Sequence, residues 1–200
     1  MIHRHKTGMG YVVTTIAVAV VIGVALSSCQ QPKEPPKLII DESVAGDFED
    51  LATETWTQFL GVFEARSDCF GDVRLRATRT LDSRAGYDPK SATVTVRVPG
   101  TPALLQGALV HEWAHHVEFQ CEAHQDLRPA FLAAQGLPPD TPWRPDDAPA
   151  DTPISAWANI PSEHYAEATI ELVLGRRQIP TKVRVTRAAV RVIEEWAAGD

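Results

Sequence analysis

The sequence predicts one α+β domain, in which a helix and a small β-sheet are followed by several helices. Apolar residues recur every three or four positions over residues 41–68, as on one face of a helix. Apolar and polar residues alternate over 73–77 and over 92–98, which is typical of strands. Helical spacing returns after residue 101, so the sequence predicts the order helix, sheet, helices.

The two predicted strands are expected to form a hairpin, because the common turn residues Gly86, Asp88 and Pro89 lie between them. Thr101 followed by Pro102 predicts the start of the next helix, since Thr caps helices and Pro favours their first turn. This helix is expected to extend to about residue 120. Its apolar residues lie around the whole circumference, so it is expected to be buried on most sides.

The C-terminal part is expected to be helical around one long loop. A short helix is predicted over 128–135, and two more over 162–177 and 186–198, with a possible short strand at 182–185. The segment 137–161 contains seven prolines and several aspartates, which excludes a regular element. Loops of this length in a compact domain are commonly functional or mobile.

The overall charge excludes nucleic acid as a partner. The chain of 200 residues has 26 acidic and 19 basic residues, a formal net charge of -7 and a pI of about 5.5. Binding to a phosphate backbone depends on a basic surface. The composition provides none.

The first 28 residues are expected to be a signal peptide, because a basic start precedes a long apolar stretch. This stretch ends in Leu-Ser-Ser-Cys29, which resembles the lipobox of bacterial lipoproteins. The resemblance implies cleavage before Cys29 and a lipid anchor on its thiol, with the protein held outside the cytoplasm at the cell membrane. A membrane-spanning anchor is the alternative, although the stretch is short for one. Residues 29–37 are expected to be a tether, and 38–200 the domain.

Cys69 and Cys121 are the two other cysteines. A compartment outside the cytoplasm permits disulfides, so we expect them to be bonded to each other. The alternative is two separate buried thiols, because the sequence does not show the distance between them.

Residues His111, Glu112 and His115 form the pattern His-Glu-x-x-His within the helix predicted from residue 102. Side chains four residues apart project from one helix face, so both imidazoles can bind one zinc ion, while Glu112 can act on water at the same side. Ala108 and Phe119 fall on the same face, which places the imidazoles inward. Hydrogen bonds within the core are the alternative role for such a pair.

A catalytic zinc ion commonly has three protein ligands, so a third must be found. Glu163 and Glu167 share a face of the predicted helix 162–177 with apolar residues. Buried carboxylates require partners, and zinc for Glu163 and a ligand imidazole for Glu167 would supply them. His124, nine residues after His115, is the alternative third ligand.

With these residues the chain resembles the gluzincin-type zinc metallopeptidases, in which a second helix contributes a Glu ligand after His-Glu-x-x-His. The resemblance implies a zincin-like domain and Zn²⁺ bound by His111, His115 and Glu163. Glu112 would be the general base, and Glu167 would orient a ligand histidine. It also implies hydrolysis of a peptide or protein substrate, which would lie extended beside an edge strand equivalent to 92–98.

The chain departs from this family at several positions. Many relatives have Asn and Asp where this chain has Ser162 and Glu167. The pattern Gly-x-x-His of the metzincins is also absent, because Glu118 and Cys121 occupy those positions. No His or Tyr follows Tyr165 to stabilise an oxyanion, and Tyr87 could reach the site only from the predicted hairpin.

Two other classes of function are alternatives to a peptidase. A non-catalytic zinc-containing surface lipoprotein could use the same ligands and bind a partner or a cell-wall component. Glu112 favours the enzyme, because a structural zinc site does not need a general base. A metal chaperone is expected to have His-rich or Met-rich tracts, and the sequence contains none.

Overall fold

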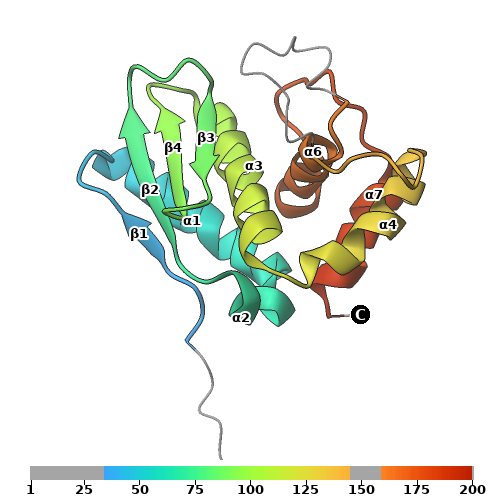
Figure 1. Cartoon of the computed structure of the whole chain (residues 1–200). Coiled ribbons are helices and arrows are strands. Elements are labelled where there is room, and N and C mark those ends of the chain that lie inside the picture. Colours follow the sequence, from blue (N-terminus) through green and yellow to red (C-terminus); the bar gives the residue numbers. More distant parts are fainter. Residues whose placement is uncertain (1–33, 145–158, 200) are drawn as a thin grey trace, which may run out of the picture. The chain divides into compact units, whose positions relative to one another are not determined.

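The computed structural model describes residues 34–144 and 159–199 and shows an α+β fold, which confirms the predicted class (Figure 1). Residues 33–200 form one compact unit. The described residues contain these elements in order: β1 (Leu38–Ile40), α1 (Gly46–Val62), a 3-10 turn (Glu64–Arg66), α2 (Ser67–Phe70), β2 (Val73–Thr78), β3 (Ala85–Asp88), β4 (Thr93–Arg97), α3 (Pro102–Gln120), α4 (His124–Gln135), α6 (Pro161–Leu174) and α7 (Arg187–Ala197). The predicted signal peptide and Cys29 lie outside the described residues. In the described part of the chain, no helix is long and apolar enough to cross a membrane.

The four strands form a mixed sheet in the order β1-β2-β4-β3. Strand β4 pairs with β2 in parallel and with β3 antiparallel, so the predicted hairpin between the segments 73–77 and 92–98 is wrong. Gly86 and Asp88 belong to β3 rather than to a turn. These residue types are rare in strands, and the pattern of β3 was hidden because an edge strand is only partly buried.

This topology also changes which strand is exposed for pairing. The segment 92–98 was expected to be an edge, but β4 is an inner strand between β2 and β3. The edge strand that contacts α3 is β3. An extended chain could therefore be added to the sheet beside β3, and not beside β4.

Helix α3 is the central helix of the fold and begins as predicted. The Thr101 side chain accepts a hydrogen bond from the Leu104 backbone N–H, and Pro102 lies in the first turn. The helix packs against α1, α6, β3 and β4. Phe119 was expected to point inward but is 43% exposed, in the last turn of the helix, where the Tyr87 ring and the Arg144 guanidinium lie against it.

Aromatic rings fill the space between α1 and α3. The Trp113 ring lies 4.9 Å from that of Trp56 and 5.7 Å from that of Phe59, both edge to face. Such pairs add to the free energy gained by burying the rings themselves. The predicted helix over 41–68 is shorter in the structure, since α1 covers only its middle and a 3-10 turn and α2 follow.

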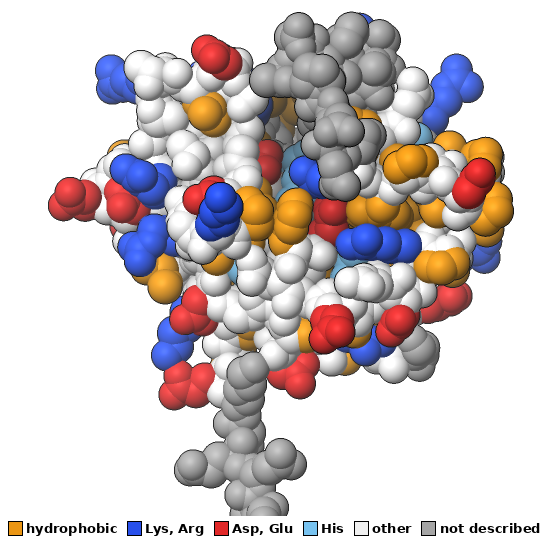
Figure 2. All heavy atoms as spheres, in the orientation of Figure 1, with side chains coloured by type: hydrophobic (Ala, Val, Ile, Leu, Met, Phe, Trp, Pro, Cys, Tyr) orange, Lys and Arg blue, Asp and Glu red, His pale blue; other side chains and the backbone are white. Residues whose placement is uncertain are grey.

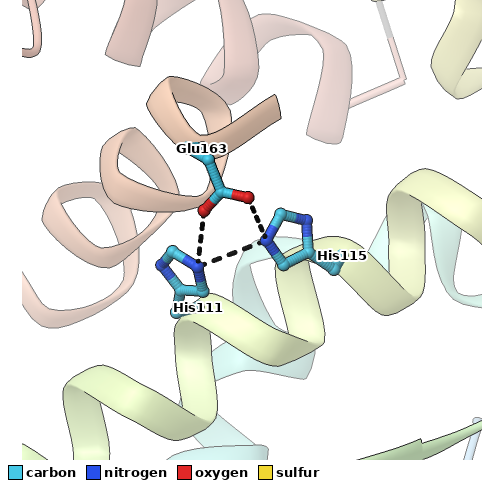
Figure 3. A group of neighbouring side chains, drawn as sticks. All are labelled: His111, His115 and Glu163. Carbon is cyan, nitrogen blue, oxygen red and sulfur yellow. Dashed lines mark hydrogen bonds and ion pairs between the residues drawn. The ribbon is translucent and has the colours of Figure 1, made fainter. Parts of the chain in front are cut away.

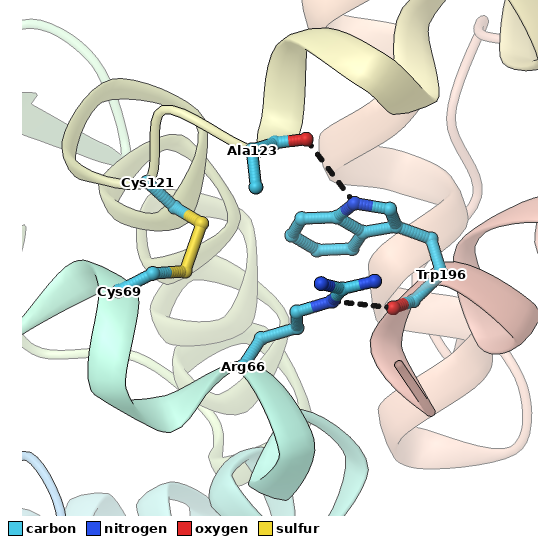
Figure 4. The surroundings of a disulfide bond; sticks show 5 residues. All are labelled: Arg66, Cys69, Cys121, Ala123 and Trp196. Carbon is cyan, nitrogen blue, oxygen red and sulfur yellow. Dashed lines mark hydrogen bonds between the residues drawn. A yellow bond between two sulfur atoms is a disulfide. The ribbon is translucent and has the colours of Figure 1, made fainter. Parts of the chain in front are cut away.

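Cys69 and Cys121 form a disulfide, which confirms the predicted pairing (Figure 4). The bond joins α2 to the end of α3 and closes a loop of 52 residues, for which chain entropy gives about 4 kcal/mol of stabilisation. Beside it, Arg66 Nε donates to the Trp196 carbonyl and Trp196 Nε1 donates to the Ala123 carbonyl. The disulfide region thereby connects to α7.

The two C-terminal helices agree with the predictions within a few residues. Thr186 caps α7 by accepting a hydrogen bond from the Ala189 backbone N–H. The predicted strand at 182–185 does not form. In this segment the Arg184 carbonyl accepts a hydrogen bond from the Gln135 side chain of α4, so a side chain takes the place of a neighbouring strand.

Candidate metal centre

Two imidazoles of α3 and one carboxylate of α6 point toward a common centre (Figure 3). His111 Nε2 lies 3.2 Å from His115 Nε2 and 3.0 Å from Glu163 Oε2. His115 Nε2 lies 3.5 Å from Glu163 Oε1. Ligands about 2.0–2.1 Å from a tetrahedral metal ion are separated by about 3.3 Å, so these distances fit a single ion.

Burial and the contacts of the carboxylate support the same interpretation. All three side chains are buried, and both oxygens of Glu163 face imidazole nitrogens. A buried carboxylate is costly unless a cation or hydrogen-bond donors are close. The group formed by His111, His115 and Glu163 could therefore hold a metal ion.

A carboxylate lies behind each imidazole. Glu167 Oε1 is 3.2 Å from His111 Nδ1, and Glu118 Oε2 is 2.9 Å from His115 Nδ1. An ionised carboxylate can only accept a hydrogen bond, so these contacts favour the tautomer that carries its proton on Nδ1. The Nε2 lone pairs then face each other across the centre, where they can bind a metal.

Each of these carboxylates also has a cationic partner. Arg177 Nη1 forms an ion pair with Glu167 Oε2. Arg144 Nη2 lies 3.5 Å from Glu118 Oε2 and 3.1 Å from His115 Nδ1. The positive charges favour the ionised carboxylates, which in turn keep their acceptor role.

Sequence reasoning named Glu167 but missed Glu118, Arg144 and Arg177. Glu118 follows His115 by three positions on the same helix, and this spacing could have identified it. The two arginines come from segments after α4 and after α6, and both lie beyond the spacing at which side chains of one helix meet their partners. No local pattern indicated them.

The pKa values of the three central groups reflect their mutual contacts. Burial lowers the pKa of His111 and of His115, but the hydrogen bonds to carboxylates outweigh it and raise both above the usual value. Burial raises the pKa of Glu163, yet the two imidazoles lower it well below its usual range.

Glu112 lies at the wall of a cavity of about 290 Å³ beside His111. Burial raises the pKa of Glu112, and the charges of His111 and His115 lower it only in part, so it lies above its usual value. The cavity is also lined by His111 and Glu167, and by apolar residues of α3 and α6. A carboxyl group with a raised pKa in a cavity is suited to accept and release a proton.

The alternative ligand His124 is not part of this centre. Its ring is buried among Trp143, Tyr165 and Trp196, with ring centroids 4.5–5.7 Å away. Among the residues that the structure describes, the group with metal-binding geometry contains only His111, His115 and Glu163.

Tyr87 also lies outside the centre. The tyrosine was considered for oxyanion stabilisation, but its hydroxyl is 2.9 Å from His116 Nδ1. His116 Nε2 is 3.1 Å from the Gly71 carbonyl, so this nitrogen donates and Nδ1 accepts from the Tyr87 hydroxyl. These contacts fasten β3 to α3 and leave the tyrosine a structural role.

The surface in Figure 2 carries charged and histidine side chains near its middle, with hydrophobic side chains around them.

Comparison with known proteins adds no family assignment. No family model, no curated protein and no solved structure matches this chain.

Proposed function

We propose that the protein is a zinc-dependent peptidase with a zincin-like domain. The observation that carries the proposal is the convergence of His111, His115 and Glu163 beside a cavity lined by Glu112. Two histidines and one glutamate are a common ligand set of catalytic zinc, and three protein ligands leave one position open. A structural zinc site commonly has four.

The chemistry follows from the positions of these residues. A zinc ion held by the three ligands supplies a Lewis acid that polarises a carbonyl group and lowers the pKa of water. Glu112 accepts a proton from the attacking water and then donates it to the leaving amine. Its raised pKa suits both steps, because a more basic carboxylate accepts a proton more readily.

The substrate is proposed to be a peptide segment in extended conformation. The cavity beside the ligands is lined by Arg84 and Ala85, where β3 begins, and by Leu104 and Ile170 of the two ligand helices. A peptide paired with the free edge of β3 would pass this cavity, and an apolar side chain could enter it.

The protein is further proposed to act outside the cytoplasm, anchored to the cell membrane through a lipid on Cys29. The lipobox-like sequence before Cys29 supports this location, and the disulfide between Cys69 and Cys121 is typical of such a compartment. Lipid labelling that persists in Cys29→Ser would contradict the anchor.

The peptidase is tested with the zinc-loaded protein and its Glu112→Gln variant in a digest of an unbiased peptide library. The substitution keeps the size of the side chain but removes the proton acceptor, so cleavage should fall by about 10²–10⁴ while zinc remains bound. Cleavage by Glu112→Gln at the wild-type rate would exclude Glu112 as the base. If the wild-type protein binds zinc firmly and cleaves nothing, the non-catalytic zinc-containing surface lipoprotein becomes the better proposal.

A further inference from the structure

The carboxylate of Glu118 occupies a position behind His115 that matches the position of Glu167 behind His111. Its Oε2 lies 2.9 Å from His115 Nδ1, and its Oε1 accepts a hydrogen bond of 3.0 Å from Trp143 Nε1. Both oxygens are therefore engaged. The side chain is 3% exposed, so neither contact is replaced by bulk solvent.

Trp143 links Glu118 to the other helix of the centre. Its backbone carbonyl accepts a hydrogen bond of 3.1 Å from the Ser162 N–H, immediately before Glu163. Its ring packs against the Arg128 guanidinium, 5.1 Å away, and against the Phe131 ring, 5.6 Å away. Trp143 thus contacts both Glu118, which is the partner of His115 on α3, and the start of α6.

The side chain of Ser162, the residue before Glu163, makes no such link between Glu118 and α6. Ser162 is fully buried, and its hydroxyl has no hydrogen-bond partner in the described ranges 34–144 and 159–199. The orientation of His115 therefore depends on Glu118 of its own helix, on the indole that holds this carboxylate, and on Arg144, whose Nη2 lies 3.1 Å from His115 Nδ1.

From these contacts we propose that Glu118 is a positioning residue that sets the orientation of His115 toward the metal. Trp143 holds Glu118 and the start of α6 in place through its two hydrogen bonds. The proposal rests on the metal centre of the proposed function. It does not depend on which reaction the centre catalyses. Partners of this kind typically change metal affinity by about 10–100-fold when they are removed.

The substitution Glu118→Gln tests the role without a large change in shape. A Gln side chain has one acceptor oxygen, so it cannot accept hydrogen bonds from both His115 Nδ1 and Trp143 Nε1 in this arrangement. Zinc affinity, measured by competition with a chelator, should fall by about 10–100-fold. The cobalt(II) absorption spectrum should change as well, because it reports ligand geometry, which a merely stabilising residue would leave unaltered.

Three further variants make the test decisive. Glu122→Gln removes the same charge from an exposed side chain just after α3 and should leave zinc affinity within about twofold. Glu167→Gln should weaken zinc binding about as much as Glu118→Gln does. Trp143→Phe keeps a ring but removes the N–H, and it should weaken zinc binding severalfold.

The outcomes separate the two proposals. Wild-type zinc affinity and an unaltered cobalt spectrum in folded Glu118→Gln would overturn the positioning role. If Glu118→Gln fails to fold, unchanged zinc affinity in Trp143→Phe overturns it instead. A wild-type protein that binds zinc but cleaves no peptide refutes the peptidase and leaves the role of Glu118 standing. A wild-type protein that binds no zinc refutes both.

Discussion

Two regions of the molecule contain buried histidines, and they differ in the hydrogen-bond partners that they offer to the imidazoles. Around the centre, His111 and His115 each face one carboxylate from Nδ1 and share Glu163 at Nε2. His124, by contrast, lies in a pocket of aromatic rings, and neither of its nitrogens has a hydrogen-bond partner in the described part of the chain. All three side chains are buried to a similar extent.

The difference shows that burial alone does not identify a metal ligand. Burial disfavours the charged form of each imidazole, but only the carboxylates near His111 and His115 reverse its effect and raise their pKa values. The pKa of His124 falls to about 3, because its distant charged neighbours do not compensate for burial. A ligand histidine is thus distinguished by the acceptors around it.

The largest expected effect that separates the two regions is a pH dependence of stability caused by His124. Its pKa is about 3 in the folded protein against a usual 6.5, so between these values the unfolded chain binds a proton that the folded chain does not. The free energy of unfolding therefore falls as the pH decreases through this window, by about 2 kcal/mol at pH 5 from this residue. Urea denaturation of the zinc-free protein at pH 8 and pH 5 measures it, with His124→Phe as the reference.

The variant isolates this contribution, because any packing cost of the larger ring is the same at both pH values and cancels. His124→Phe should lose about 2 kcal/mol less than the wild-type protein between pH 8 and pH 5. Equal losses in the two proteins would show that His124 is not held neutral by its surroundings.

A smaller effect is expected for His111 and His115, and the quantity to measure is the affinity for zinc. Because the pKa values of both imidazoles are raised, bound zinc would compete with protons for them. Each displaced proton would weaken zinc binding by at most about tenfold, or about 1.4 kcal/mol, for a decrease of one pH unit. Chelator competition at pH 7.5 and pH 6.5 measures this change. Zinc affinity that does not vary with pH would contradict the assignment of imidazole ligands.

Most of the helical scaffold could be predicted from the sequence, because helix signals are local. Thr101 and Pro102 marked the start of α3, and the spacing of apolar residues gave its length. Strand β3 was missed because Gly86 and Asp88 are common turn residues. Its position also depends on pairing with β4. The parallel pairing of β2 with β4 has no local signal at all.

In the candidate site, too, local spacing predicts some residues, and others come together only through tertiary folding. The spacing within α3 and within α6 was sufficient to propose His111, His115, Glu163 and Glu167, whose side chains the structure brings together. Glu118 was within reach of the same reasoning and was overlooked. Arg144 meets Glu118 only through tertiary folding, and a single sequence gives no sign of such a contact.

The zinc content of two matched variants tests the central claim most directly. His111→Phe and His124→Phe exchange the same residue types at buried positions, one in the proposed centre and one in the aromatic pocket. Metal analysis of the purified proteins, with circular dichroism to verify folding, should give about one zinc ion per chain for the wild type and for His124→Phe, and almost none for His111→Phe. Zinc retained by folded His111→Phe and lost from His124→Phe would contradict the account.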